Sequence, residues 1–311
     1  MLLGCLSIQA ANDDLITKQI TINLDKAGTL PNKIASSEMY KITNLKIIGE
    51  INGTDWNMIR EMAGRDNRGY GTEGKLSVLD LSEAKIVKGG DSYYPGDNCY
   101  TSNDEIGEKA FYDCSRLTSL TLPVGITSIG YDAFAYCSGL TSLTLPAGIT
   151  SIGEYAFSRC SGLTSLNLPA GITSIDKYAF SGCSRLTSLT LPAGITSIGE
   201  FAFSYCSGLT SIYVYAEKVP RIGRYAFEGC ASRKCTLYVP KGTYDNYRLS
   251  ELGYFENIVE FDATGIDKTT TSTDVEEVSR YSLNGQRLAV PVKGLNIVKY
   301  SDGTVRKVVV K

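Results

Sequence analysis

The chain has 311 residues, of which 43% are hydrophobic and 21% charged, a balance typical of folded proteins and too apolar for a disordered one. Its 31 Lys and Arg residues against 33 Asp and Glu residues give a net charge of −2, so no overall basic excess favours nucleic acid or an anionic membrane. Histidine is absent, which excludes Ser-His-Asp and Cys-His catalytic sites, HExxH zinc sites and histidine general bases.

Residues 1–11 form an apolar segment without a basic residue, similar to the second half of an export signal. Leu2-Leu3-Gly4-Cys5 has the pattern of a bacterial lipobox and predicts lipidation of Cys5, whereas Ser7-Ile8-Gln9-Ala10 suits signal peptidase I. An apolar run without an export role is the third alternative. We expect export, to the cell surface, the outer membrane or the medium. No later stretch reaches the ~20 apolar residues of a membrane-spanning helix.

Residues 12–105 are predicted to form an N-terminal capping region. They contain strand-like segments at 20–24, 45–48 and 76–81, but not the repeat that follows. Because a stack of repeats would otherwise expose its apolar end, an atypical unit is expected here. A short helix is predicted around residues 58–62, with Trp56 as a buried anchor. Residues 91–105 form a polar loop that is either a binding loop or a solvated insertion, and its tyrosines are Tyr93, Tyr94 and Tyr100.

The segment Gly69-Tyr70-Gly71-Thr72-Glu73-Gly74 matches G-x-G-x-x-G, a pattern found in nucleotide-binding proteins. That chemistry needs a helix after the glycines, so that phosphate meets the helix N-terminus. A strand is predicted there instead, so these glycines indicate a loop.

From residue 106 the sequence repeats with a period of 23 residues, with one step of 24. Each unit fits AFxxCSxLTSLTLPxGITSIGxx, in which L-x-x-L-x-L precedes a proline. Alternation along a strand places Leu143 and Leu145 on one face and Thr144 on the other. The Ala-Phe pair and the cysteine are predicted in a helical or 3₁₀ turn. The repeated aromatic and thiol residues are Phe111, Phe134, Phe157, Phe180, Phe203, Phe227 and Cys114, Cys137, Cys160, Cys183, Cys206, Cys230.

One such unit cannot bury its apolar side alone, whereas stacked units bury it against each other. Strands of neighbouring units would lie roughly 4.8 Å apart. The period lies within the roughly 20–29 residues of leucine-rich repeats. Residues 106–262 are therefore predicted to form a leucine-rich β-solenoid with its C-terminal cap.

The unit IGxxAFxxCxxLxxLxLPxGIxxI resembles the BspA-type leucine-rich repeats of bacterial surface proteins. Residues 212–223 are similar to the altered last repeat of that family and residues 237–259 to its terminal cap. Residues 45–81 resemble the N-terminal cap of Bacteroides-type members. The resemblance implies a cell-surface or secreted protein that binds other proteins or host surfaces.

Residues 263–279 are rich in Thr and Ser and are predicted to be a linker. In residues 280–311, Asn284-Gly285 and Asp302-Gly303 separate alternating runs, which predicts a small antiparallel β tail. The tail resembles the C-terminal sorting tail of Bacteroidetes exported proteins, although it is shorter. Three alternatives stay open for this tail: it directs export, it docks on the solenoid, or it is a relic.

The repeat cysteines are too far apart along the chain for a metal site, whose ligands cluster within about two to four residues. We expect small buried hydrophobic residues with free thiols. Bridges are better placed between Cys230 and Cys235, or from Cys99 to either. The acidic residues of the repeats do not form a pair suited to glycoside hydrolysis. We therefore predict no enzyme activity, no metal and no cofactor.

Two sets of side chains are candidates for contact with a partner. The outward strand face carries one line, Thr121, Thr144, Asn167, Thr190 and Tyr213. The residues that vary between units stand at the turns, and they are Tyr131, Glu154, Lys177, Glu200, Arg224, Tyr136, Arg159 and Tyr205.

The turn residues include Tyr and Arg, which match the composition of binding hot spots better than the threonines do. Ordinary solvated turns are the alternative. We predict a module that binds an extracellular protein of a host or of a bacterial surface. A glycan-binding module and a structural spacer are the alternatives.

Overall fold

The computed structural model describes residues 15–94, 99–263, 277–282, 287–288, 294–300 and 305–310. They divide into two compact units, residues 1–260 and 261–311. Cys5 and the predicted signal segment lie outside the described residues.

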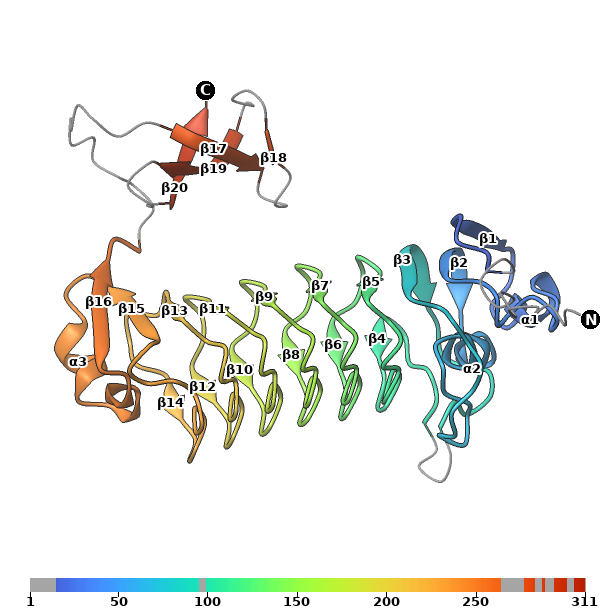
Figure 1. Cartoon of the computed structure of the whole chain (residues 1–311), viewed down its shortest axis with the longest axis horizontal. Helices are drawn as coiled ribbons and strands as arrows, with labels where there is room; N and C mark the ends of the chain where they lie inside the picture. The colour runs from blue at the N-terminus through green and yellow to red at the C-terminus, as the bar shows by residue number, and fades with distance from the viewer. Residues whose placement is uncertain are drawn as a thin grey trace, which may run out of the picture. The chain divides into compact units, whose positions relative to one another are not determined.

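The first unit is a parallel β-solenoid whose coils lie side by side (Figure 1). A ten-stranded sheet runs along it, and each strand contributes one rung. In order, its strands are β1 (Ile20–Leu24), β2 (Asn44–Ile51), β3 (Val78–Ile86), β5 (Ser119–Thr121), β7 (Ser142–Thr144), β9 (Ser165–Asn167), β11 (Ser188–Leu191), β13 (Ser211–Val214), β15 (Thr236–Pro240) and β16 (Asn257–Phe261).

Two shorter parallel sheets form another side of the coils. One contains β4 (Glu105–Ile106), β6 (Ser128–Ile129) and β8 (Ser151–Ile152), and the other β10 (Ser174–Ile175), β12 (Ser197–Ile198) and β14 (Arg221–Ile222). The pairing follows the sequence repeat, since Leu120 faces Leu143 and Leu143 faces Leu166. The predicted leucine-rich solenoid is therefore confirmed.

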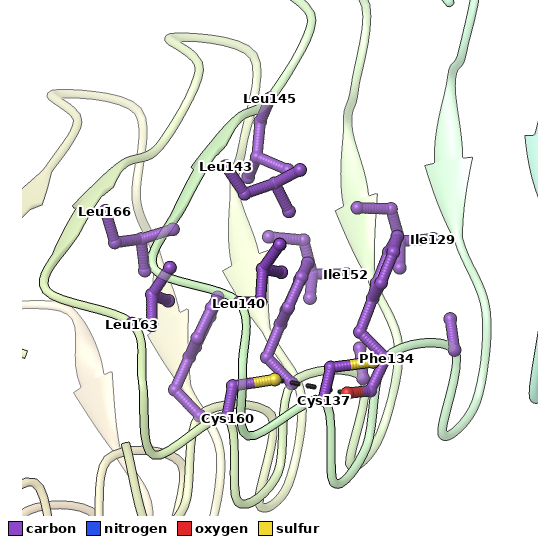
Figure 2. Packing of buried hydrophobic residues seen from close by; sticks show 14 of the residues in the cluster. Ile129, Phe134, Cys137, Leu140, Leu143, Leu145, Ile152, Cys160, Leu163 and Leu166 are labelled. Atoms are coloured by element: carbon purple, nitrogen blue, oxygen red, sulfur yellow. Dashed lines mark hydrogen bonds between the residues drawn. The ribbon is translucent and has the colours of Figure 1, made fainter. Parts of the chain in front are cut away.

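The interior is built from columns of identical residues (Figure 2). The repeat phenylalanines from Phe111 to Phe203 are completely buried, and the rings of Phe134 and Phe157 stack with centroids 4.9 Å apart. The thiol of Cys160 donates a hydrogen bond of 3.1 Å to the carbonyl of Phe134 in the preceding coil. The same bond recurs from Cys137, Cys183, Cys206 and Cys230.

The Ala-Phe segment makes a tight turn in each coil and also pairs with the next coil. The amides of Ala133, Ala135 and Cys137 donate to carbonyls three residues back, which is the 3₁₀ pattern. The alternate amides of Asp132, Phe134 and Tyr136 donate to the following coil, over 3.1, 2.7 and 2.8 Å. Every second amide therefore links neighbouring coils.

The N-terminal cap replaces the amides that a preceding coil would supply. Its helix α2 (Gly53–Met62) includes the predicted segment 58–62, and Trp56 is buried as expected. The indole nitrogen of Trp56 donates to the carbonyl of Ala110 over 2.9 Å, and the Tyr93 hydroxyl donates to the carbonyl of Glu108 over 3.0 Å. Tyr93 is thus a core residue, although the sequence places it in a polar loop.

The remaining elements close the two ends of the first unit. The turn before α1 (Leu30–Lys33) is tied to α2, because the buried Asp55 carboxylate accepts the amides of Gly28 and Leu30. At the other end, α3 (Tyr244–Arg248) and the 3₁₀ helix η1 (Glu251–Tyr254) bring Phe255 against Phe227. Residues 69–74 form a loop that leads to β3, as predicted.

The second unit is an antiparallel sheet in the order β18-β17-β19-β20. Its strands are β17 (Glu277–Ser282), β18 (Arg287–Leu288), β19 (Gly294–Tyr300) and β20 (Val305–Val310). The sheet agrees with the predicted β tail, and its first strand begins inside the segment expected as a linker. The two Asn-Gly and Asp-Gly turns lie outside the described residues.

Candidate binding groove

Each Ala-Phe turn holds two residues in the left-handed backbone region, one before the Ala-Phe pair and one after it. Bulky side chains are uncommon there, and such positions cluster at functional sites. We call these two rows the first and second columns. The first is Lys109, Asp132, Tyr155, Tyr178, Phe201 and Tyr225, and the second is Asp113, Tyr136, Arg159, Gly182, Tyr205 and Gly229.

From Tyr155 to Tyr225 the first column is a ladder of aromatic rings. The ring centroid of Tyr178 lies 4.6 Å from that of Tyr155 and 4.8 Å from that of Phe201, and both pairs are nearly parallel. The ladder continues to Tyr225 at 5.1 Å, while Tyr131 meets Tyr155 edge-on at 5.8 Å. Stacking of this kind stabilises the turns. It also covers both faces of the central rings.

The two columns border a groove of about 430 Å³ that crosses several coils. Its floor is made of Ser158, Ser181 and Ser204, one from each of three successive coils. The hydroxyls of Ser181 and Ser204 are hydrogen-bonded to each other over 2.8 Å. A neighbouring hollow of about 470 Å³ extends along the second column. The groove therefore offers aromatic walls above a hydroxyl floor.

The charged residues that line the groove are Asp132 and Arg159. The pKa of Asp132 is raised from 3.8 to about 6, mainly by burial; Lys109 opposes the shift, and the nearby acids Glu108 and Glu154 add to it. The Arg159 guanidinium lies over the ring of Tyr136, 5.4 Å from its centroid, as a cation–π pair. Burial also raises the pKa of Tyr131 and Tyr155, so these rings stay neutral.

The structure divides the candidate contact residues into separate places. Tyr131, Tyr136, Arg159 and Tyr205 line the groove. Lys177 and Glu200 lie beside it and form an ion pair of 3.9 Å between neighbouring coils, and Arg224 covers the ring of Tyr225. Glu154 is partly buried next to Tyr155.

The strand line lies elsewhere, in the ten-stranded sheet. The register joins Thr121 to Thr144, Thr144 to Asn167, Asn167 to Thr190 and Thr190 to Tyr213. None of these five residues lines the groove. Tyr213 stacks on Tyr238 with centroids 4.4 Å apart, so its ring contributes to the C-terminal end of the sheet.

Sequence reasoning missed the first column, although its signal is present. Tyr155, Tyr178 and Phe201 follow one another at intervals of 23 residues. The serine floor keeps the same period. What the period does not reveal is that both columns turn toward one groove, because this depends on the left-handed backbone of the turn.

The cysteines from Cys99 onward are buried, and Cys230 and Cys235 are free thiols, so the bridges considered between them or with Cys99 are not formed. Burial raises the pKa of Cys137, Cys160 and Cys235, the last to about 11. Within the described part of the chain, His, Cys, Asp and Glu form no group that could hold a metal ion. Over the same residues, no helix has the length and apolarity needed to cross a membrane.

The fold and its columns define the chain as a leucine-rich repeat solenoid. More narrowly, residues 104–234 match the family described as BspA type leucine rich repeat region, in six copies. No curated protein matches the chain.

Solved structures of similar proteins include a leucine rich repeat protein of T. pallidum, with 32% identity and a TM-score of 0.35 over 40% of this chain and 56% of that one. A leucine rich cell surface protein from Faecalibacterium prausnitzii A2-165 has 22% identity and a TM-score of 0.34 over 70% of this chain and 51% of that one. The pneumococcal vaccine antigen PcpA has 16% identity and a TM-score of 0.43, over 71% and 69%. The chain thus spans little more than half the length of the first two.

Proposed function

We propose that this chain is a non-enzymatic recognition module that binds another protein outside the cell, with the aromatic groove as its contact surface. The observation that carries the proposal is the groove itself, where exposed Tyr131, Tyr136 and Tyr205 stand together with Arg159. Tyr and Arg are enriched among residues that dominate protein interfaces. A rigid stack of coils also holds these side chains in place before binding, which lowers the entropic cost of association.

The strand face is less suited to selective recognition. The row of threonines just before these strands has its hydroxyls used within the solenoid, since Thr141, Thr164 and Thr187 each donate to the carbonyl one coil back. The exposed residues there are nearly the same from coil to coil. Variation between coils is concentrated at the turns, where a partner could be distinguished.

A glycan is the second candidate ligand, because exposed rings such as Tyr205 can stack on sugars. The central rings of the first column do not favour it, since Tyr155, Tyr178 and Phe201 cover each other's faces. Only their edges remain for a ligand. Edges and serine hydroxyls suit the mixed apolar and polar contacts of a polypeptide surface better than they suit a stacked sugar.

The proposed location is the cell surface or the medium, after export, with lipidation of Cys5 as the proposed means of attachment. The match of residues 104–234 to BspA-type repeats supports this location. The similar F. prausnitzii protein is itself described as a cell surface protein.

The test is a binding panel with two matched variants. The purified chain, immobilised without residues 1–11, is probed with extracellular host proteins, bacterial surface proteins and glycans. One variant changes the groove (Tyr136→Ala with Arg159→Ala), and the control changes the strand face (Thr121→Ala with Thr144→Ala). We expect saturable binding of a protein, weakened at least tenfold by the groove variant and retained by the control.

Three results would overturn the proposal. If only the strand-face variant loses binding, the contact surface is the ten-stranded sheet and not the groove. Binding of glycans without any protein would establish the second candidate, and absence of binding across the panel would favour a structural spacer.

A further inference from the structure

The second column is interrupted at Gly182, between Arg159 and Tyr205. Its backbone does not require glycine, because Tyr136, Arg159 and Tyr205 adopt the same left-handed conformation at φ values of 64°, 60° and 58°, against 76° for Gly182. A side chain is therefore missing where the fold accepts one. We call the resulting space the Gly182 slot.

Gly182 and Tyr205 line the same hollow. A Cβ atom added at Gly182 would meet only atoms of Arg159 within its nearest contacts, the closest being Cγ at 3.4 Å. Tyr205 instead leans over Gly229, where an added Cβ would come within 2.8 Å of its ring. Gly229 thus makes room for the Tyr205 ring, and Gly182 adds no side chain beside Arg159. The hollow of about 470 Å³ has Arg159 and Tyr205 among its lining residues, with Ser181 beneath them.

The width of the slot fits one flat group. Rings in neighbouring coils of the first column lie 4.6 to 5.1 Å apart. Arg159 and Tyr205 are separated by two coil steps, so a ring at Gly182 would stand one coil step from the backbone of each. It would complete the second column in the way that Tyr178 completes the first.

The two walls favour an aromatic ring. The Arg159 guanidinium lies over Tyr136, 5.4 Å from the ring centroid, and the Arg159 Cγ is the atom nearest to a Cβ placed at Gly182. A ring inserted there would gain a cation–π contact with Arg159 and an offset-stacked contact with Tyr205. The Ser181 hydroxyl on the floor can accept the N–H of a Trp or the O–H of a Tyr.

We propose that the Gly182 slot binds one aromatic side chain, presented by the protein partner. The inference rests on the proposed function and names the chemistry that the groove selects. It also predicts that a protein without an exposed aromatic residue binds poorly.

The test uses N-acetyl-tryptophanamide as the probe and N-acetyl-leucinamide as its aliphatic control, with binding followed by NMR. Gly182→Tyr fills the slot with the residue that the equivalent coil positions carry, and Thr144→Ala serves as a variant far from it. We expect the aromatic amide to bind the native chain in the millimolar range, as suits a small ligand. Gly182→Tyr should weaken this binding at least tenfold. Thr144→Ala should leave it unchanged. The leucine probe should not bind.

Should Gly182→Tyr fail to fold, Arg159→Gln with Tyr205→Leu removes both walls and leaves the glycine, and the same loss is expected. Equal binding of both probes, undiminished binding to the filled slot, absence of binding, or binding of methyl glucoside in place of the aromatic amide would each overturn the inference. If a protein partner binds the Gly182→Tyr variant and the native chain with equal affinity, the inference about the slot is wrong, whereas the proposed function of protein binding still holds.

Discussion

Asp132 occupies the first-column position that later coils give to aromatic rings, and its carboxyl group is partly buried at the end of the groove. Removal from water disfavours the charged form, which is why its pKa rises to about 6 although Lys109 opposes the shift. The group thus titrates near the pH of many natural environments. Its ionisation changes the net charge of the groove lining and also the stability of the coil.

Asp132 should make the protein more stable in mild acid. Because its folded pKa of about 6 exceeds the ordinary 3.8, the folded state binds the proton more tightly. This contribution is complete below about pH 4 and is lost as the pH rises through about 6. Asp132→Asn keeps a residue tolerated at positive φ but removes the titration. Urea unfolding at pH 5 and pH 7.5 should show a larger loss of stability in the native chain than in the variant, and equal losses would refute the assignment.

At the scale of elements, the N-terminal cap acts by hydrogen bonding as well as by covering the core. The first repeat coil has carbonyls that a preceding coil would pair, and the cap reaches them with side chains. Trp56 and Arg60 donate to Ala110, and Tyr93 donates to Glu108. Helix α2 and residues 91–94 are therefore joined to the first coil by side-chain hydrogen bonds.

Tyr93→Phe should destabilise the solenoid by about 0.5–1.5 kcal/mol, because it removes one hydrogen bond and keeps the buried ring. Tyr100→Phe is the matched control, since Tyr100 is exposed and its loss should stay within about 0.5 kcal/mol. Chemical denaturation of both variants measures the difference. A Tyr93→Phe chain as stable as the control would mean that the carbonyl of Glu108 is satisfied in another way.

At the scale of the first unit, each middle coil pairs only with its two neighbours, through β5 to β13 and through the alternate amides of the turns. A solenoid of this kind is a sum of similar units and the contacts between them. Removing one whole unit should therefore preserve the fold.

Deletion of residues 134–156 removes one period and joins Ala133 to Phe157, which restores the repeat. We expect a folded chain with cooperative unfolding and a smaller dependence on denaturant, since less surface is exposed on unfolding. Deletion of residues 134–155 is the control, because it leaves one residue too many in the join and displaces the Phe column. Circular dichroism during urea titration compares the two. If both deletion variants unfold at the same urea concentration, the register between coils does not determine the stability of the solenoid.

Several features of the fold could be predicted residue by residue. Phe134, Cys137 and Leu143 are buried, and Thr144 is exposed, as the alternation and the period indicate. Trp56 is buried in the N-terminal cap, as expected for an anchor of the short helix predicted there. Tyr93 could not be assigned, because its burial depends on a contact with Glu108, 15 residues away and in another coil.

The sequence by itself determined the coil and its stacking, because units of one length with the same apolar positions bury each other only in register. It also pointed to Tyr131, Tyr136, Arg159 and Tyr205 as variable turn residues. The tertiary structure decided that these side chains face a common groove with the Tyr155–Phe201 ladder. It also decided that Gly182 leaves a slot beside Tyr205. The left-handed turns that arrange both columns are held by hydrogen bonds to the next coil, and no local pattern contains those partners.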